Sequence, residues 1–141
     1  MTDQVIAGSC LCKSVRVRIT PPTLFVSHCH CATCRAAHGA AFVTWTAVPN
    51  ARFVLDDPDH ALSRYRSSPD VERGFCSRCG TQMLYQGGGA DRTYVPVAVL
   101  DSIDQPPDSH VSFEERAPWL AGCAALPCCR AKTSEPVTGD L

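Results

Sequence analysis

Hydrophobic and polar residues alternate along most of this chain with the period of two that is typical of β-strands. In residues 14–20, Val15, Val17 and Ile19 alternate with arginines before Pro21-Pro22 ends the pattern. Similar short segments, separated by turn residues, predict seven further strands at residues 24–28, 42–48, 52–55, 71–75, 81–86, 94–100 and 110–113. A helix is expected only at residues 33–38. The pattern therefore predicts an all-β fold built of short antiparallel strands.

Composition is that of a globular protein. Apolar residues make up 45% and charged residues 19% of the 141 residues, which suits one domain of ordinary size. We expect that domain over residues 1–132 and a flexible C-terminal tail over residues 133–141. No apolar run approaches the length of about 18 residues that a membrane span requires, and the N-terminus does not resemble a secretory signal. We therefore expect a cytoplasmic protein with no membrane partner.

Cysteines carry the strongest chemical signal. Seven of the ten form three tight clusters: Cys10-Leu-Cys12, Cys29-His-Cys31-Ala-Thr-Cys34 and Cys76-Ser-Arg-Cys79. In a reducing cytosol such clusters are typical of metal sites rather than disulfides, and Zn²⁺ takes four such ligands in a tetrahedron. Seven thiolates divide most simply into four and three, which predicts two zinc ions per chain. A four-thiolate site is structural, whereas a three-thiolate site leaves a position open for water or substrate, as in catalytic zinc sites.

Spacing alone does not assign the clusters to the two ions, but the predicted strands favour one division. Cys10 and Cys12 precede the first predicted strand, and Cys76 to Cys79 form a knuckle between two others, with Gly80 allowing the turn. Pairing these clusters gives a four-thiolate site that joins distant parts of the chain and contributes to folding. Cys29, Cys31 and Cys34 then form the three-thiolate site. Thiolates on two zinc ions make the formal net charge more negative than −1, so nucleic acid is not an expected partner.

Four blocks of sequence resemble the glutathione-dependent formaldehyde-activating enzyme family, also called the centromere protein V family. The resemblance is carried by Gly8-Ser9-Cys10-Leu11-Cys12, by Cys29-His30-Cys31-Ala32-Thr33-Cys34-Arg35, by Phe75-Cys76-Ser77-Arg78-Cys79-Gly80-Thr81 and by Arg116-Ala117-Pro118-Trp119. Lys13 stands where the family commonly has Gly. The resemblance implies an Mss4-like zinc β-tent with a structural zinc on Cys10, Cys12, Cys76 and Cys79 and a catalytic zinc on Cys29, Cys31 and Cys34.

The activity that the resemblance implies is addition of the glutathione thiol to formaldehyde. We therefore expect a zinc-dependent carbon-sulfur lyase or synthase whose partners are a glutathione-like thiol and a small aldehyde. A coordinated thiol is deprotonated, and the thiolate is the form that attacks a carbonyl carbon. The alternative is a non-enzymatic zinc module, either chaperone-like or associated with chromatin. An open three-thiolate site favours the enzyme, whereas closure of that site by another cysteine favours the module.

Two residues beside the predicted catalytic cysteines are candidate substrate contacts. His28 and His30 lie on the same side of a strand-like segment, and His30 is placed to donate to substrate or pass a proton; the alternative is an imidazole that bonds only to backbone. Arg35 follows the third ligand, and its guanidinium suits a substrate carboxylate. A surface arginine that screens the anionic zinc site is the alternative for Arg35.

Other polar and thiol residues are expected to have ordinary roles. Cys123, Cys128 and Cys129 are interpreted as small buried hydrophobic residues, although one of them could close the three-thiolate site as a fourth ligand. A solvated face is expected for these charged residues: Glu72, Arg73, Glu114, Glu115 and Arg116. His110 is expected to be inert.

Overall fold

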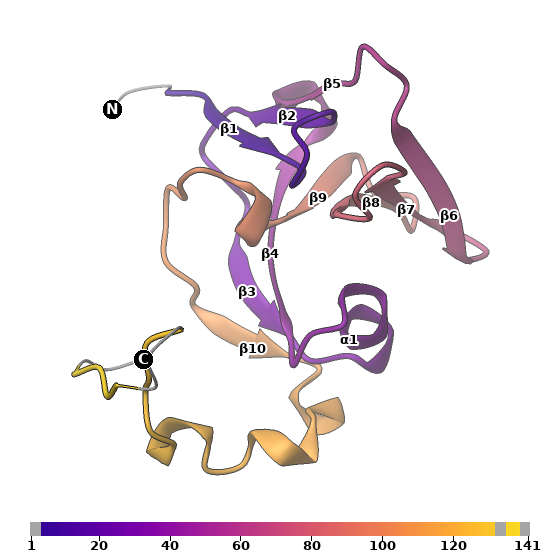
Figure 1. Cartoon of the computed structure of the whole chain (residues 1–141). Coiled ribbons are helices and arrows are strands. Elements are labelled where there is room, and N and C mark those ends of the chain that lie inside the picture. The colour runs from indigo at the N-terminus through magenta and orange to yellow at the C-terminus, as the bar shows by residue number, and fades with distance from the viewer. Residues whose placement is uncertain (1–3, 132–134, 139–141) are drawn as a thin grey trace.

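The computed structural model describes residues 4–131 and 135–138, whose strands form two sheets (Figure 1). The smaller sheet has the order β1-β2-β5, with β1 at Ile6–Ser9, β2 at Arg16–Ile19 and β5 at Phe53–Asp56. The larger sheet has the order β10-β3-β4-β9-β8-β7-β6. Its strands are β3 (Val26–Cys29), β4 (Val43–Pro49), β6 (Leu62–Ser68), β7 (Val71–Cys76), β8 (Gln82–Gly87), β9 (Arg92–Pro96) and β10 (Ser109–Val111). The fold is mostly β, as the sequence predicts.

The largest differences from the predicted elements occur at three places. Strands β1 and β6 were not predicted, because β1 contains Ala-Gly and β6 is a largely exposed edge strand rich in Arg and Ser. The sequence predicts Cys10 and Cys12 before the first strand, but they lie between β1 and β2. The predicted strand at residues 94–100 ends at Pro96, where a 3₁₀ turn (Val97–Val99) begins. The predicted helix is α1 (Ala32–His38), which ends at Gly39 in the left-handed conformation.

Strand β10 pairs with β3 in parallel, so the expectation of antiparallel strands is wrong for this pair. The register sets Ser109 beside Ser27 and Val111 beside Cys29. A parallel pair needs a long crossover connection, and here most of the chain lies between the two strands. The pairing therefore brings the segment after residue 111 beside the central cysteine cluster.

Two hydrophobic clusters fill the interior. The larger one takes the buried faces of both sheets, including Val17 and Ile19 from β2 and Met83 from β8, each 0% exposed. The period-two pattern of β2 thus places its valine and isoleucine inside and its arginines outside. The smaller cluster contains Cys29 and Cys34 with Trp45, and lies where α1 meets the larger sheet. Burial of these thiols is therefore part of the fold itself.

The chain after β10 runs through three 3₁₀ turns, Phe113–Glu115, Pro118–Leu120 and Cys123–Ala125. Within the predicted tail, residues 135–138 return toward residues 128–130, where the Val137 N–H donates to the Cys128 carbonyl at 2.7 Å. The rest of that tail, residues 133–134 and 139–141, lies outside the described residues. In the described part of the chain, no helix has the length and apolar character that a membrane crossing demands.

Candidate metal centres and the adjoining cavities

The four cysteines Cys10, Cys12, Cys76 and Cys79 meet between the two sheets. Their Sγ atoms all lie within 4.8 Å of one another, with 3.6 Å between Cys10 and Cys12 and 3.7 Å between Cys12 and Cys76. A tetrahedron with Zn–S bonds of about 2.3 Å has sulfur atoms about 3.8 Å apart. The donor set and its spacing therefore fit a tetrahedral zinc ion. The turn after β1 supplies two of these thiols and the predicted β7–β8 knuckle supplies the other two.

Backbone and hydroxyl groups around this site favour thiolates at its exposed side. Contacts with the Thr81 hydroxyl and backbone, followed by the Cys12 backbone, lower the pKa of Cys79 to about 5, and contacts with Ser14 lower the pKa of Cys12. Burial instead raises the pKa of Cys76 to about 11. Gly80, with φ of 78°, turns the knuckle, and its N–H donates to the Cys76 carbonyl at 2.8 Å.

The three cysteines Cys29, Cys31 and Cys34 form a second group whose Sγ atoms lie within 4.8 Å of one another. Cys29 ends β3, Cys31 is the N-cap of α1, and Cys34 lies in the first turn of that helix. The Cys34 N–H donates to Cys31 Sγ at 3.3 Å, so the helix start holds two of the thiols together. Three soft donors on one tight turn suit zinc and leave one tetrahedral position without a thiol.

Burial is the largest single influence on the pKa of each thiol in this second group. It raises the pKa of Cys29 to about 12 and raises that of Cys34, where Arg73 acts in the opposite direction. For Cys31, burial also acts upward, but hydrogen bonds from the Cys34 backbone and side chain outweigh it and lower the pKa. A metal ion is the partner that would offset the cost of holding three buried thiolates.

Three histidines gather on one side of the Cys29–Cys34 segment. His30, which is 2% exposed, has its Nε2 at 2.8 Å from His110 Nδ1, while His28 Nδ1 lies 2.8 Å from the Thr44 hydroxyl. The rings of His28 and His30 both pack on Phe42 and His110, so the prediction that they share a side is confirmed. His110, which is expected from the sequence to be inert, is the hydrogen-bond partner of His30 in the structure.

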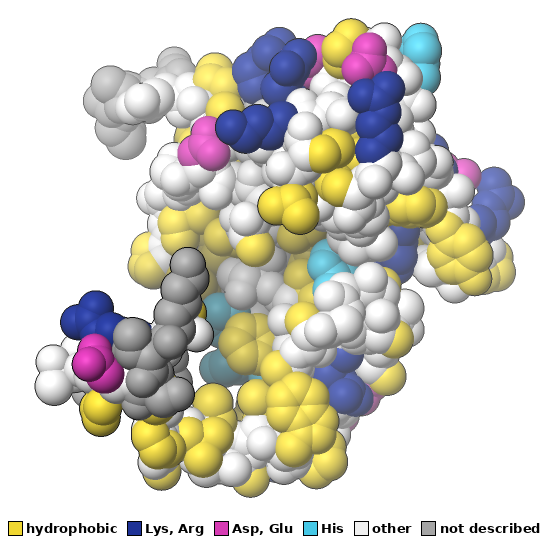
Figure 2. Space-filling model, in the orientation of Figure 1, with side chains coloured by type: hydrophobic (Ala, Val, Ile, Leu, Met, Phe, Trp, Pro, Cys, Tyr) yellow, Lys and Arg dark blue, Asp and Glu magenta, His cyan; other side chains and the backbone are white. Residues whose placement is uncertain are grey.

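A cavity of about 700 Å³ opens beside this histidine group. His30, Phe42 and His110 line one wall, and the C-terminal segment from Phe113 to Ala124 lines the other. Figure 2 shows histidine side chains in the depth of the hollow that separates the C-terminal segment from the sheets. His30 Nδ1 is buried and has no protein hydrogen-bond partner among the described residues. His30 is thus a buried imidazole in the wall of this cavity with one ring nitrogen unpaired among the described residues.

Arg35 and Glu115 fasten the C-terminal segment to the start of α1. The Arg35 guanidinium donates to the His30 carbonyl at 3.2 Å and to the Glu115 carbonyl at 3.0 Å. In return, the Glu115 carboxylate accepts from the Ala32 N–H at 2.9 Å. Glu115 therefore does more than solvate a surface, and Arg35 joins two segments that lie 80 residues apart.

The comparison with known families bears on this combination of two thiol groups. The family described as glutathione-dependent formaldehyde-activating enzyme matches residues 5–116. The chain belongs to this family. Both thiol groups and the histidine group fall within the matched residues.

This family member is also similar to two individual proteins. It is 30% identical over 78 residues to an uncharacterized lyase of Schizosaccharomyces pombe, a match that covers 55% of each protein and so spans about half the length of that relative. A crystal structure of a Rhodobacter sphaeroides protein covers 74% of this chain and 99% of its own, with a TM-score of 0.60 and 19% identity. The Rhodobacter likeness concerns the fold.

The extra cysteines of this family member do not complete either thiol group. Among residues 4–131 and 135–138, neither group includes Cys123, Cys128 or Cys129. Cys128 and Cys129 are exposed and Cys123 is half-buried, so the interpretation of these residues as buried hydrophobic side chains is wrong. Nearly all described residues from 121 onward are themselves exposed, so this part of the described chain has little interior in which a thiol could be buried.

Proposed function

We propose that this protein is a zinc-dependent carbon-sulfur lyase or synthase that adds a glutathione-like thiol to formaldehyde or a related small aldehyde. The observation that carries the proposal is the three-thiol group of Cys29, Cys31 and Cys34, which no fourth described side chain completes, in a member of the formaldehyde-activating family. In the reaction the thiolate sulfur attacks the carbonyl carbon. The carbonyl π electrons move to oxygen, which takes up the proton that the thiol lost.

The proposed metal at both thiol groups is zinc, with different roles. Cys10, Cys12, Cys76 and Cys79 would hold a structural ion, since four thiolates leave no open position. Cys29, Cys31 and Cys34 would hold a catalytic ion, which favours the thiolate form of a thiol that reaches its open position. The sulfur spacing supports the structural assignment. The three-thiol group supports the catalytic one.

We assign the cavity beside His30 to the substrates. His30 and His110 fix each other through their 2.8 Å contact, so a substrate oxygen in the cavity would meet an oriented imidazole pair. Phe42 and Phe113 line the cavity, and their rings would reduce the water around a bound aldehyde. Arg35 remains a candidate contact for a substrate carboxylate. The guanidinium N–H groups that do not donate to the His30 and Glu115 carbonyls could make this contact. Holding thiol and aldehyde together raises their effective concentration.

A non-enzymatic interaction module is the second candidate function. The C-terminal segment exposes large apolar side chains, with Trp119 67% and Leu126 66% exposed, and exposed apolar groups of this kind are common at binding surfaces. If the protein is such a module, the exposed segment would bind a partner and the three-thiol metal site would be closed to substrates.

Calorimetric titration of reduced glutathione into protein of measured metal content tests the enzyme, with S-methylglutathione as the control that lacks a free thiol. Exchange NMR with ¹³C-formaldehyde then compares the rate of adduct formation with the uncatalysed rate. Thiol-dependent binding and faster exchange, both lost in Cys31→Ser, support the proposal. Metal-loaded protein that binds neither glutathione nor other small thiols would place the interaction module first.

A further inference from the structure

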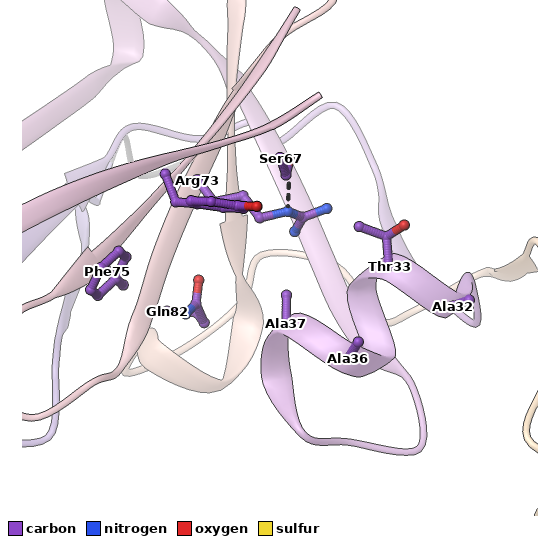
Figure 3. Close-up of a pocket in the computed structure, with 9 residues that line it drawn as sticks. Ala32, Thr33, Ala36, Ala37, Ser67, Arg73, Phe75 and Gln82 are labelled. Carbon is purple, nitrogen blue, oxygen red and sulfur yellow. Dashed lines mark hydrogen bonds between the residues drawn. The ribbon is translucent and has the colours of Figure 1, made fainter. Parts of the chain in front are cut away.

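Arg73 on β7 is a buried cation beside the three-thiol group. It is 8% exposed, so the solvated position expected from the sequence is wrong. Its Nε donates to the Ser67 hydroxyl at 3.2 Å, and its Nη2 lies 3.8 Å from Cys34 Sγ. Figure 3 shows the guanidinium reaching from the strand toward α1, beside Ser67. The Tyr85 ring lies under it, 5.5 Å from the guanidinium carbon.

No carboxylate neutralises this guanidinium within residues 4–131 and 135–138. The nearby ion pairs join Arg64 and Arg66 to Glu72, on the exposed side of β6 and β7. The Nη1 group of Arg73 is buried and has no protein partner there. A buried charge without an opposite charge is strongly destabilising. The fold therefore requires an anion on the inner side of β7, and the sulfur of Cys34 is the group that Arg73 contacts there.

Three thiolates with one divalent ion carry a net charge of −1, which a single guanidinium balances. We propose that Arg73 is the counter-ion of the Cys29, Cys31 and Cys34 metal centre and the positioning residue that orients Cys34. The inference rests on the metal site proposed above and not on the identity of the substrate. Its consequence for the chemistry is that a neutral centre does not repel an incoming thiolate, whereas the unbalanced centre would.

A groove of about 680 Å³ suggests a different role for Arg73, as an anchor for a substrate carboxylate. The groove lies between α1 and strands β6 to β8, and its lining includes Thr33, Ser67 and Arg73. However, Nη1 is buried and Nη2 is directed at Cys34. These two observations favour contact with the thiolates over contact with a ligand in the groove.

The test measures metal affinity in the absence of any thiol or aldehyde substrate, so that it is independent of the lyase proposal. Full-length protein is loaded with Co²⁺, whose thiolate absorption bands report each site, and is titrated with a chelator. The four-thiol site serves as the reference within the same molecule. The variants are Arg73→Gln and Arg73→Lys, with Arg66→Gln as the matched control, because Arg66 is an exposed arginine on the neighbouring strand that pairs with Glu72.

We expect Arg73→Gln to lower the affinity of the three-thiol site roughly ten- to 100-fold, the range for groups that support metal ligands. Arg73→Lys should restore part of that affinity, and the four-thiol site and Arg66→Gln should be unchanged. Unaltered affinity in Arg73→Gln, or equal weakening of both sites, overturns the proposal. Weaker glutathione binding at unchanged metal affinity would instead make Arg73 a substrate anchor, which also overturns it.

Ser67→Ala supplies the same test if Arg73→Gln does not fold. This change removes the hydroxyl that accepts from Arg73 Nε and leaves the charge and both thiol groups in place. A several-fold lower affinity at the three-thiol site alone is expected, because the guanidinium is then less firmly directed at Cys34. An affinity identical to that of the unmodified protein would count against the proposal.

Discussion

Removing either metal site should destabilise this protein to different extents, because the two thiol groups close loops of very different length. The test compares Cys10→Ser/Cys12→Ser with Cys29→Ser/Cys31→Ser. Each pair replaces one buried cysteine and one more accessible cysteine, so the direct effects of the substitutions are similar. What differs is that Cys12 and Cys76 lie 64 residues apart, whereas the second group spans only the turn from Cys29 to Cys34.

The size of the difference follows from the entropy of the unfolded chain. Treated as a crosslink, a metal that joins residues 64 positions apart stabilises the fold by about 4 kcal/mol, and one that closes a five-residue loop by about 2 kcal/mol. The N-terminal double variant should therefore lose about 2 kcal/mol more than the other. For a chain of this length, that corresponds to a Tm lower by roughly a further 8 °C.

Thermal unfolding followed by circular dichroism, with metal content measured for each protein, provides the assay. Each double variant should lose one metal ion per chain, and the Cys29→Ser/Cys31→Ser protein should keep most of its stability while losing activity. Equal decreases in Tm, or a larger decrease for Cys29→Ser/Cys31→Ser, would refute the division into a structural and a catalytic site.

Two further predictions concern single side chains. Lys13 has φ of 64°, which is costly for any residue except glycine, so Lys13→Gly should raise the free energy of unfolding by about 0.5 to 1 kcal/mol; an equal gain from Lys13→Ala in urea unfolding would contradict this reason. Burial, followed by the charge of Arg73, lowers the pKa of His38 to about 4 from 6.5, so the folded state takes up this proton less readily than the unfolded state. Stability from His38 is therefore present above pH 6.5 and lost as the pH falls toward 4, and His38→Gln should flatten that acid dependence; parallel curves for the two proteins between pH 7 and 5 would refute it.

The sequence was sufficient to predict the three cysteine clusters because the spacing within each cluster is local. Cysteines one or two residues apart converge whatever the fold. The assignment of Cys76 and Cys79 to the N-terminal pair was favoured by the predicted strands and implied by the family resemblance. The class of fold was equally accessible, since the buried Val17 and Ile19 follow the alternation of a strand. The assignment to the family did not depend on any tertiary contact.

Burial and long-range contacts were not accessible from the sequence. Arg73 lies in a segment of mixed polarity, and only tertiary contacts such as those with Cys34 and Tyr85 make it an interior residue. His110 and Glu115 were passed over because their partners lie 80 and 83 residues away in the sequence. The parallel pairing of β10 with β3 creates those contacts. The sequence of the three residues of β10 does not predict this pairing.

That same pairing has a consequence for how the protein is made. During synthesis the Cys29–Cys34 turn leaves the ribosome long before His110 and Glu115, which must close contacts over 80 and 83 residues. Contacts between residues so far apart in the sequence form slowly and late in folding. A nascent chain that has not reached β10 therefore lacks the contacts that His110 and Glu115 make beside the three thiols. Ribosome-bound chains stopped before residue 109 would thus show whether the three thiols take up a metal ion without the C-terminal segment.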